Sequence, residues 1–251
     1  MLTRATIAES FQLNGKFEYL SMTSSHGVRF SPTKEASLDP ALRNLAQALP
    51  QSTLGVAMIA EMPGPSGIPD LVALPNPGAA LTRRLDSKIP AILSRTAIEI
   101  VASLKVRQGI TLKSLQSRVP RADRTISQSL RHLIESGAII QEGNLLYRAG
   151  PLQPVGNLYA LEAKVDDWRK GVRQAFRYQS WCSASSLVLS RMPKNSDLLI
   201  STSRRLSIGL ALEDRWIVRP RISRIDHVQR LWGSEHFIAA LGFAPTKSPQ
   251  L

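Results

Sequence analysis

Three ionisable residues stand inside apolar stretches of this chain. Asp70 lies in GIPDLVAL (67–74), and Glu162 and Lys164 lie in NLYALEAKV (157–165). Charged groups in strand-like apolar sequence are costly unless they are paired, hydrogen-bonded or bound to a metal ion. The spacing therefore points to a polar site built on two strands, and a divalent-metal centre would explain it.

The chemistry of such a centre follows from the residue types. Carboxylates hold a hard cation such as Mg²⁺ or Mn²⁺ through oxygen, so we expect Asp70 and Glu162 to be the metal ligands. Lys164 follows Glu162 by two residues, so on a strand both side chains point to the same side. There its ammonium can orient or help deprotonate an attacking water and offset the charge that builds on a phosphodiester.

The pair Pro69-Asp70, followed later by Glu162-Ala163-Lys164, resembles the PD-(D/E)xK nuclease superfamily. The resemblance implies an α/β fold with a restriction-endonuclease-like αβββαβ core. It also implies Mg²⁺ or Mn²⁺ as the cofactor and catalytic roles for Asp70, Glu162 and Lys164.

A helix-like segment, DDWRKGVRQAFRYQSW (166–181), follows and carries Gln174 and Tyr178 four residues apart, hence on one helix face. This pair is similar to the Gln-x-x-x-Tyr element of the RecB-like branch of these nucleases. There the element helps to engage the substrate strand, so the resemblance adds Gln174 and Tyr178 to the expected catalytic residues.

Structural alternatives stay open for each of these residues. Asp70 follows a proline and suits a turn. Glu162 and Lys164 fit the solvated face of an edge strand. Gln174 and Tyr178 also fit ordinary helix packing.

The same predicted helix carries Arg169, Arg173 and Arg177 at every fourth position, which places them in one stripe. An arginine stripe beside a metal site suits phosphate, so we expect these residues to bind DNA, with a merely solvated basic face as the alternative. Apolar residues of the segment are expected to bury the helix on a sheet: Trp168, Val172, Ala175 and Phe176.

Further elements would complete the core. We expect a helix over 38–50, a strand over 54–62, a turn over 63–67 and the Asp70 strand, with Glu61 as a further candidate for the metal shell. After Lys164 we expect a strand at 185–190, a helix passing at Ser207 into a strand over 196–212, a strand at 215–221 and an amphipathic helix at 225–242.

Between Asp70 and Glu162 lies far more sequence than a hairpin needs, and it resembles a winged helix-turn-helix. Helices are expected at 89–104, 111–119 and 122–137, and a hairpin at 138–149 with Gly143 and Asn144 at its turn.

In the third of these helices, an apolar period turns Ile126, Leu130, Leu133 and Ile134 inward. The opposite face carries side chains that read base edges and phosphates in a major groove. The expected DNA-binding residues are Arg124, Thr125, Ser127, Gln128 and Arg131. A surface for protein contacts is the alternative.

The expected domains are an N-terminal arm (1–37), a discontinuous nuclease-like core (38–80 and 151–245) and the inserted winged helix-turn-helix (85–150).

The composition agrees with a nucleic-acid partner. The 251 residues include 32 Lys and Arg but only 19 Asp and Glu, which gives a formal charge of +13.

Other classes find less support. The sole cysteine, Cys182, cannot form an internal disulfide and is expected to be buried in a protein of the cytoplasm. No apolar run is long enough to span a bilayer, no signal peptide is recognised, and no zinc cluster or phosphate-binding Gly-rich loop is found.

These observations predict a metal-dependent endonuclease of double-stranded DNA, targeted by the winged helix. The alternatives are a DNA-binding transcription regulator or adaptor with an inactive nuclease-like core, and an RNA-processing or junction-cleaving enzyme. A homodimer is left open, since no stripe locates its interface.

Overall fold

The computed structural model describes residues 20–21 and 35–242. Of these, the residues up to Pro77 and Gly156–Ile225 form unit 1, whereas Gly78–Val155 and the residues from Asp226 form unit 2. The arm expected at 1–37 lies almost wholly outside the described residues. In the described part of the chain, no helix is long and apolar enough to cross a membrane.

Unit 1 contains a mixed, seven-stranded sheet in the order β1-β2-β3-β7-β8-β9-β10. Strands β2, β3 and β7 are antiparallel neighbours, and β7, β8 and β9 are parallel. Every residue of β3, β7 and β8 is buried, as expected for central strands covered on both faces. The strands are β1 (Leu20–Ser21), β2 (Val56–Ala60), β3 (Leu71–Pro75), β7 (Tyr159–Lys164), β8 (Ala184–Leu189), β9 (Gly209–Leu212) and β10 (Arg215–Val218).

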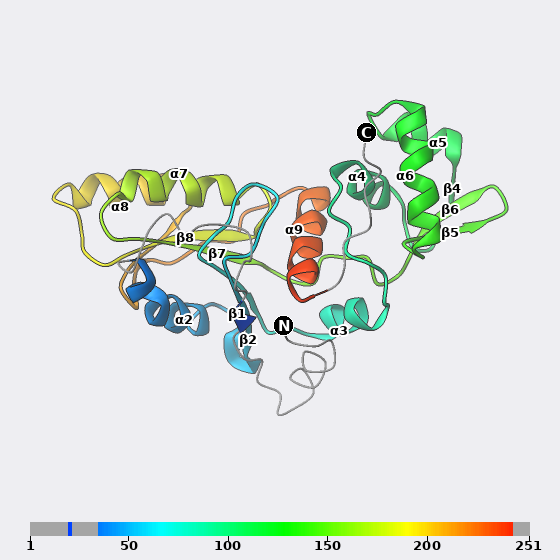
Figure 1. Ribbon diagram of the computed structural model, residues 1–251. Helices are drawn as coiled ribbons and strands as arrows, with labels where there is room; N and C mark the ends of the chain where they lie inside the picture. The colour runs from blue at the N-terminus through cyan, green and yellow to red at the C-terminus, as the bar shows by residue number, and fades with distance from the viewer. Residues whose placement is uncertain (1–19, 22–34, 243–251) are drawn as a thin grey trace. The chain divides into compact units, whose positions relative to one another are not determined.

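Helices cover both faces of this sheet (Figure 1). On one face lie the 3₁₀ helix η1 (Glu35–Leu38) and α2 (Asp39–Gln47), preceding a second 3₁₀ helix, η2 (Ser52–Leu54). The other face carries α7 (Trp168–Tyr178) and α8 (Ser196–Arg205).

The alternation of side chains along β7 fits these two layers. Tyr159, Leu161 and Ala163 pack in one apolar cluster with Leu42 and Leu45 of α2. The intervening polar residues of β7 therefore face α7.

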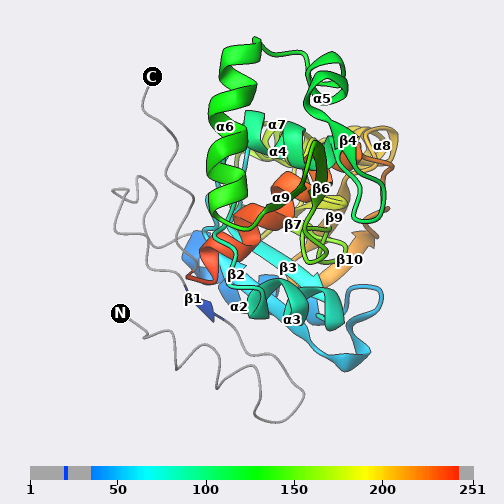
Figure 2. The same ribbon diagram turned by 90° about the vertical axis from the view of Figure 1, so that its right-hand side faces the viewer.

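Unit 2 contains a helical group with a small three-stranded antiparallel sheet, β4-β6-β5 (Figure 2). Its apolar core includes Ile98, Leu115, Ile126 and Leu146. The elements are α3 (Ala79–Asp86), α4 (Arg95–Ser103), β4 (Ile110–Thr111), α5 (Leu112–Arg118), α6 (Asp123–Glu135), β5 (Ile139–Glu142), β6 (Leu145–Arg148) and α9 (His227–Ala240).

Most predicted elements are confirmed, with two differences at the start of unit 2. The helix expected over 89–104 begins only at Arg95, where the Ser94 hydroxyl accepts from the Ala97 amide and caps it. Helix α3 was not predicted, because one of its two arginines, Arg84, is fully buried and breaks the apolar pattern.

The placement of the last helix in the nuclease-like core is wrong, because α9 belongs to unit 2. Leu231 is part of the same core as Ile98, and the Trp232 indole N–H donates to the Leu93 carbonyl at 2.8 Å. An amphipathic pattern shows that a helix buries one face, but not which surface receives it.

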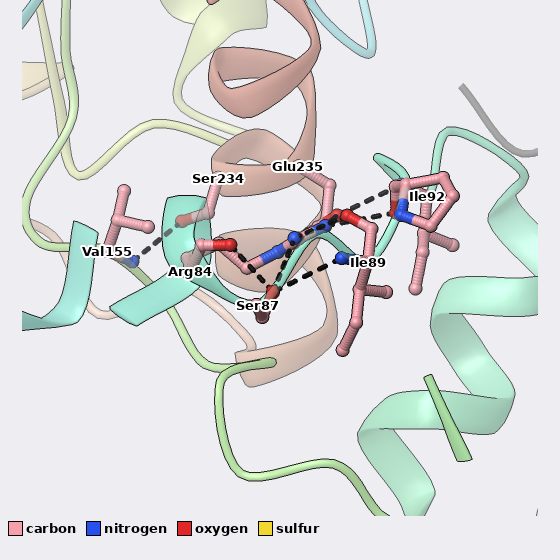
Figure 3. Close-up of polar contacts among 8 residues, drawn as sticks. Arg84, Ser87, Ile89, Ile92, Val155, Ser234 and Glu235 are labelled. Atoms are coloured by element: carbon pink, nitrogen blue, oxygen red, sulfur yellow. Dashed lines mark hydrogen bonds and ion pairs between the residues drawn. The ribbon is translucent and has the colours of Figure 1, made fainter. Parts of the chain in front are cut away.

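A buried ion pair fastens α9 to the start of unit 2 (Figure 3). The Arg84 guanidinium makes two hydrogen bonds to Glu235, at 2.8 and 2.7 Å, and neither side chain is exposed. Arg84 also donates to the carbonyls of Ile89 and Pro90, and Glu235 accepts from the Ile92 amide at 2.9 Å. These bonds hold residues 89–92 in a non-helical conformation, which explains the late start of α4.

Candidate active site

Asp70 immediately precedes β3 and lies beside the last residues of β7. The antiparallel register pairs Leu71 with Leu161, so Asp70 comes opposite Glu162 and next to Ala163. Its Oδ2 accepts a hydrogen bond of 2.7 Å from the Ala163 amide. The strand pairing therefore joins two chain segments that are distant in sequence, and it holds the Asp70 carboxyl group at the end of β7.

Glu162 and Lys164 point to the same side of β7, as the period of two predicts. The Lys164 Nζ lies 2.9 Å from Glu162 Oε1 and donates to the Ala163 carbonyl at 2.8 Å. Both side chains are buried, which excludes the alternative of a solvated edge strand. The structure thus brings Asp70, Glu162 and Lys164 into one polar cluster.

Glu35, at the start of η1, is a fourth member of this cluster that the sequence did not predict. Its Oε1 lies 3.2 Å from Lys164 Nζ, with the carboxylate partly exposed. No local pattern distinguishes Glu35, because only the tertiary fold brings it to Lys164. Glu61, predicted as a further candidate, contributes a backbone bond from its amide to the Asp70 carbonyl at 3.1 Å.

Tyr178 of α7 reaches into the cluster. Its hydroxyl oxygen lies 2.8 Å from Glu162 Oε2 and 3.1 Å from the Ile68 carbonyl, so its one proton serves one acceptor at a time. Gln174, one turn earlier, has a buried Oε1 without a hydrogen-bond partner among the described residues. The helix lies close to the sheet because Gly171 faces Leu187 and Lys164, where a Cβ would come within 3 Å of both side chains.

Burial dominates the electrostatics of the cluster. It raises the pKa of Asp70 to about 7, with a further contribution from the neighbouring Glu162. Burial also raises the pKa of Glu162, although Lys164 and Tyr178 oppose the rise. For Lys164, burial lowers the pKa, but the attraction of Glu162, Asp70 and Glu35 outweighs it and the net shift is upward. The lysine is therefore a cation at neutral pH, and the raised pKa values of Asp70 and Glu162 mean that these two neighbours ionise less readily than ordinary carboxyl groups.

The donor set fits a magnesium ion bound mainly by water. Asp70 and Glu162 supply carboxylate oxygens, and the Ala163 carbonyl faces the same cluster. Among the described residues there is no group of three or more His, Cys, Asp or Glu arranged to hold a metal ion. Mg²⁺ is usually bound by one or two protein carboxylates, with waters and substrate oxygens completing its shell.

The outer face of α7 carries the predicted arginine stripe. Arg169, Arg173 and Arg177 are all exposed, whereas Trp168, Val172 and Ala175 are buried as predicted. Phe176 was expected to pack on the sheet, and this is wrong: the residue is 52% exposed. It lies three residues after Arg173 and one before Arg177, which turns it outward among the arginines.

The expected recognition surface of unit 2 lies on α6. Ile126, Leu130 and Leu133 are buried, as predicted from their period. Arg124, Ser127, Gln128 and Arg131 are exposed, and Thr125 is half-buried. The hairpin of β5 and β6 turns at Gly143, whose φ of 57° suits glycine.

Comparison of the chain with protein-family models, curated proteins and solved structures finds no match.

Proposed function

We propose that this protein is a DNA endonuclease of the PD-(D/E)xK superfamily that hydrolyses phosphodiester bonds with Mg²⁺ or Mn²⁺. The observation that carries the proposal is the convergence of Asp70, Glu162 and Lys164 at the end of β7. Nothing in the packing of an ordinary sheet requires two carboxyl groups and an ammonium at one buried position.

The order of elements in unit 1 supports the same proposal. Along the chain, α2, the antiparallel strands β2, β3 and β7, helix α7 and the parallel strand β8 follow one another. This is the αβββαβ order that the superfamily resemblance implies. The elements of unit 2 are consistent with an inserted winged helix-turn-helix, with α5 and α6 as its helix pair and β5–β6 as its wing.

Each residue then has a chemical task. Asp70 and Glu162 would hold the metal ion, which when bound would supply Lewis-acid stabilisation and lower the pKa of a bound water. Tyr178 orients the Glu162 carboxylate through its hydroxyl. Lys164, whose pKa is raised, serves as a fixed positive charge against the phosphodiester rather than as a base. Gln174 lies one turn from Tyr178 and offers an amide to the substrate strand.

Unit 2 would deliver duplex DNA to this site. The chain leaves unit 1 directly after β3 and returns directly before β7, the two strands that position Asp70 and Glu162. Exposed residues of α6 would contact phosphates and base edges, and a tethered reader raises the local concentration of substrate.

The test is cleavage of supercoiled plasmid and of single-stranded DNA with Mg²⁺ or Mn²⁺. Wild type should cut with either ion and not in EDTA, and Asp70→Ala and Lys164→Ala should abolish cutting. Asp197→Ala, which removes an exposed acid of α8, is the matched control and should cut normally.

A second candidate, a regulator with an inactive core, draws on the exposed polar face of α6. It would be favoured if wild type failed to cut while retaining salt-sensitive DNA binding that falls on Arg124→Ala. In that outcome the nuclease proposal is wrong.

A further inference from the structure

The outer face of α7 combines positive charge with an exposed aromatic ring. Four basic residues lie on the helix between Trp168 and Tyr178, and no acidic residue interrupts them. They form no ion pair within the described part of the chain: Arg169, Lys170, Arg173 and Arg177. The face is thus an unneutralised basic surface.

Phe176 lies within this surface rather than beneath it. Residues three and four apart are neighbours on a helix, so Arg169, Arg173, Phe176 and Arg177 form one continuous strip. With 52% of its surface exposed, the phenyl ring offers an apolar face between guanidinium groups. A strip that bound only the outside of a duplex would gain nothing from the ring, because paired bases stack on one another and leave no free face.

One end of the strip lies beside the candidate active site. The Arg177 guanidinium approaches Gly67 closely, with its Nε 3.7 Å from the position of a Cβ at that residue. Gly67 belongs to the turn that leads into Asp70, and the next residue of α7, Tyr178, bonds to Glu162. A DNA strand that lay along the strip would therefore lead to the carboxyl groups of Asp70 and Glu162.

The other end leads to a hollow of about 350 Å³, lined partly by Trp168, Arg191, Met192 and Lys194. Arg169 connects strip and hollow, since its guanidinium carbon lies 4.6 Å from the centre of the Trp168 ring. The hollow exceeds the volume of a nucleobase, and its charged lining residues are Lys194 and the ion-paired Arg191 and Asp166. It offers a place for one unpaired base.

We propose that the strip formed by Arg169, Arg173, Phe176 and Arg177 binds a single-stranded segment of DNA that adjoins the scissile phosphate. Aromatic side chains in a basic groove bind single strands by stacking on bases while the cations follow the backbone. The inference rests on the proposed nuclease function and names its substrate class: duplex DNA held by unit 2 that carries an unpaired stretch.

The first test measures binding without chemistry. The full chain in EDTA is titrated into fluorescein-labelled oligo(dT) and into a blunt duplex, and fluorescence anisotropy gives both affinities. Phe176→Ala should weaken oligo(dT) binding about tenfold, in line with the loss of one stacked base. It should change duplex binding less than twofold, and Phe176→Tyr, which keeps the ring, should retain wild-type affinity.

Leu198→Ala is the matched control, because Leu198 is an exposed apolar residue of α8 with 51% of its surface accessible. It should leave both affinities unchanged. Equal effects of Phe176→Ala on the two ligands, or no effect on either, would overturn the inference. A change of elution volume of Phe176→Ala in size-exclusion chromatography would also overturn it, by assigning the ring to an interface between copies of the chain.

Cleavage with Mg²⁺ separates this inference from the nuclease proposal. A duplex with a single-stranded tail should be cut faster than a blunt duplex, and Phe176→Ala should remove the difference. Equal cutting of both substrates by wild type would leave the nuclease proposal intact and overturn the single-strand inference. If wild type cut neither substrate, but Phe176→Ala selectively lost oligo(dT) binding, the nuclease proposal would be overturned. The single-strand inference would then remain.

Discussion

Lys164 is a buried cation whose neighbours are a carboxyl group of its own strand, Glu162, and one of η1, Glu35. Its Nζ contacts Glu162 and Glu35 within 3.2 Å, so its removal leaves acids without a counter-charge. Lys164→Met should destabilise unit 1 by about 3 kcal/mol at pH 8 and by less at pH 5, where protonation relieves the carboxylates. Urea unfolding at both pH values measures this.

Lys194→Met, at an exposed lysine, is the control and should change stability by less than about 0.5 kcal/mol. An equal loss for Lys164→Met at both pH values would show that packing, rather than charge compensation, dominates at this position.

Asp70 is expected to make the stability of unit 1 depend on pH in a different way, because burial raises the pKa of its carboxyl group. Its pKa in the folded protein is about 7, above the ordinary 3.8, so the folded state holds the proton more tightly than the unfolded state. The stabilising contribution is complete below about pH 4 and is lost as pH rises through 7. Without metal, Asp70→Asn should therefore exceed wild type in stability by about 1–3 kcal/mol at pH 8, and the two should converge at pH 4.

Added Mg²⁺ should reverse that order, since it stabilises the ionised wild type and has less to bind in Asp70→Asn. Thermal melts in EDTA and in 10 mM Mg²⁺, a concentration of the order used for weak sites, give both comparisons. A stability gap that does not vary with pH would contradict the assignment of the raised pKa to Asp70.

The candidate site was predictable where charge stood out against an apolar background. Asp70, Glu162 and Lys164 are visible because β3 and β7 are otherwise apolar. Glu35 was not predictable, because an acid before a helix is commonplace and its contact with Lys164 depends on tertiary folding. Phe176 was misplaced because the pattern of α7 places it next to the buried stripe without fixing the edge of that stripe.

Helix α9 depends on the Arg84–Glu235 pair for its attachment to α3. Breaking a buried pair leaves one charge uncompensated, so Arg84→Met or Glu235→Met alone should cost about 3–5 kcal/mol in the stability of unit 2. The double variant should recover part of the loss but not all, because the Ile92 amide still loses its acceptor.

Thermal unfolding of the single and double variants gives the coupling energy. Matched changes at an exposed pair, Arg43→Met and Asp39→Met, serve as the control and should show coupling below about 1 kcal/mol. Additive losses for Arg84 and Glu235 would contradict a direct interaction.

Helix α6 makes a separate prediction about duplex binding. Arg131 is exposed, and its loss should weaken affinity for duplex DNA about threefold to tenfold. If it contacts a phosphate, the slope of log K against log salt should fall by about 1. Arg215→Ala, at an exposed arginine of β10, is the control. An equal loss of duplex affinity in this variant would show that the effect of the Arg131 substitution comes only from the lower net charge.

Among the elements, those with a clear period were predictable and those held by polar contacts were not. Strands β2, β3, β7, β8, β9 and β10 and helices α5, α6 and α7 follow their apolar spacing. The start of α4 is set by hydrogen bonds from Arg84 and Glu235 to residues 89–92, which no local pattern reveals.

Over the whole chain, the sequence predicted the first segment of unit 2 but not the second. The inserted segment was evident because Asp70 and Glu162 belong to one site and much sequence separates them. The second segment of unit 2, from Asp226, was missed because its partner surface includes a charge, Arg84, that is hidden only after folding.

The Arg84–Glu235 pair also makes the completion of unit 2 depend on the order of synthesis. A ribosome completes every strand of unit 1, up to Val218, before it reaches Glu235. Until then the nascent chain carries Arg84 and the Ile92 amide without the carboxylate that satisfies both. Unit 1 can thus assemble co-translationally while unit 2 is still incomplete. Unit 2 can dock α9 and close its core only after Glu235 has been synthesised, and nascent chains that end before Glu235 should consequently hold duplex DNA less tightly than the full chain.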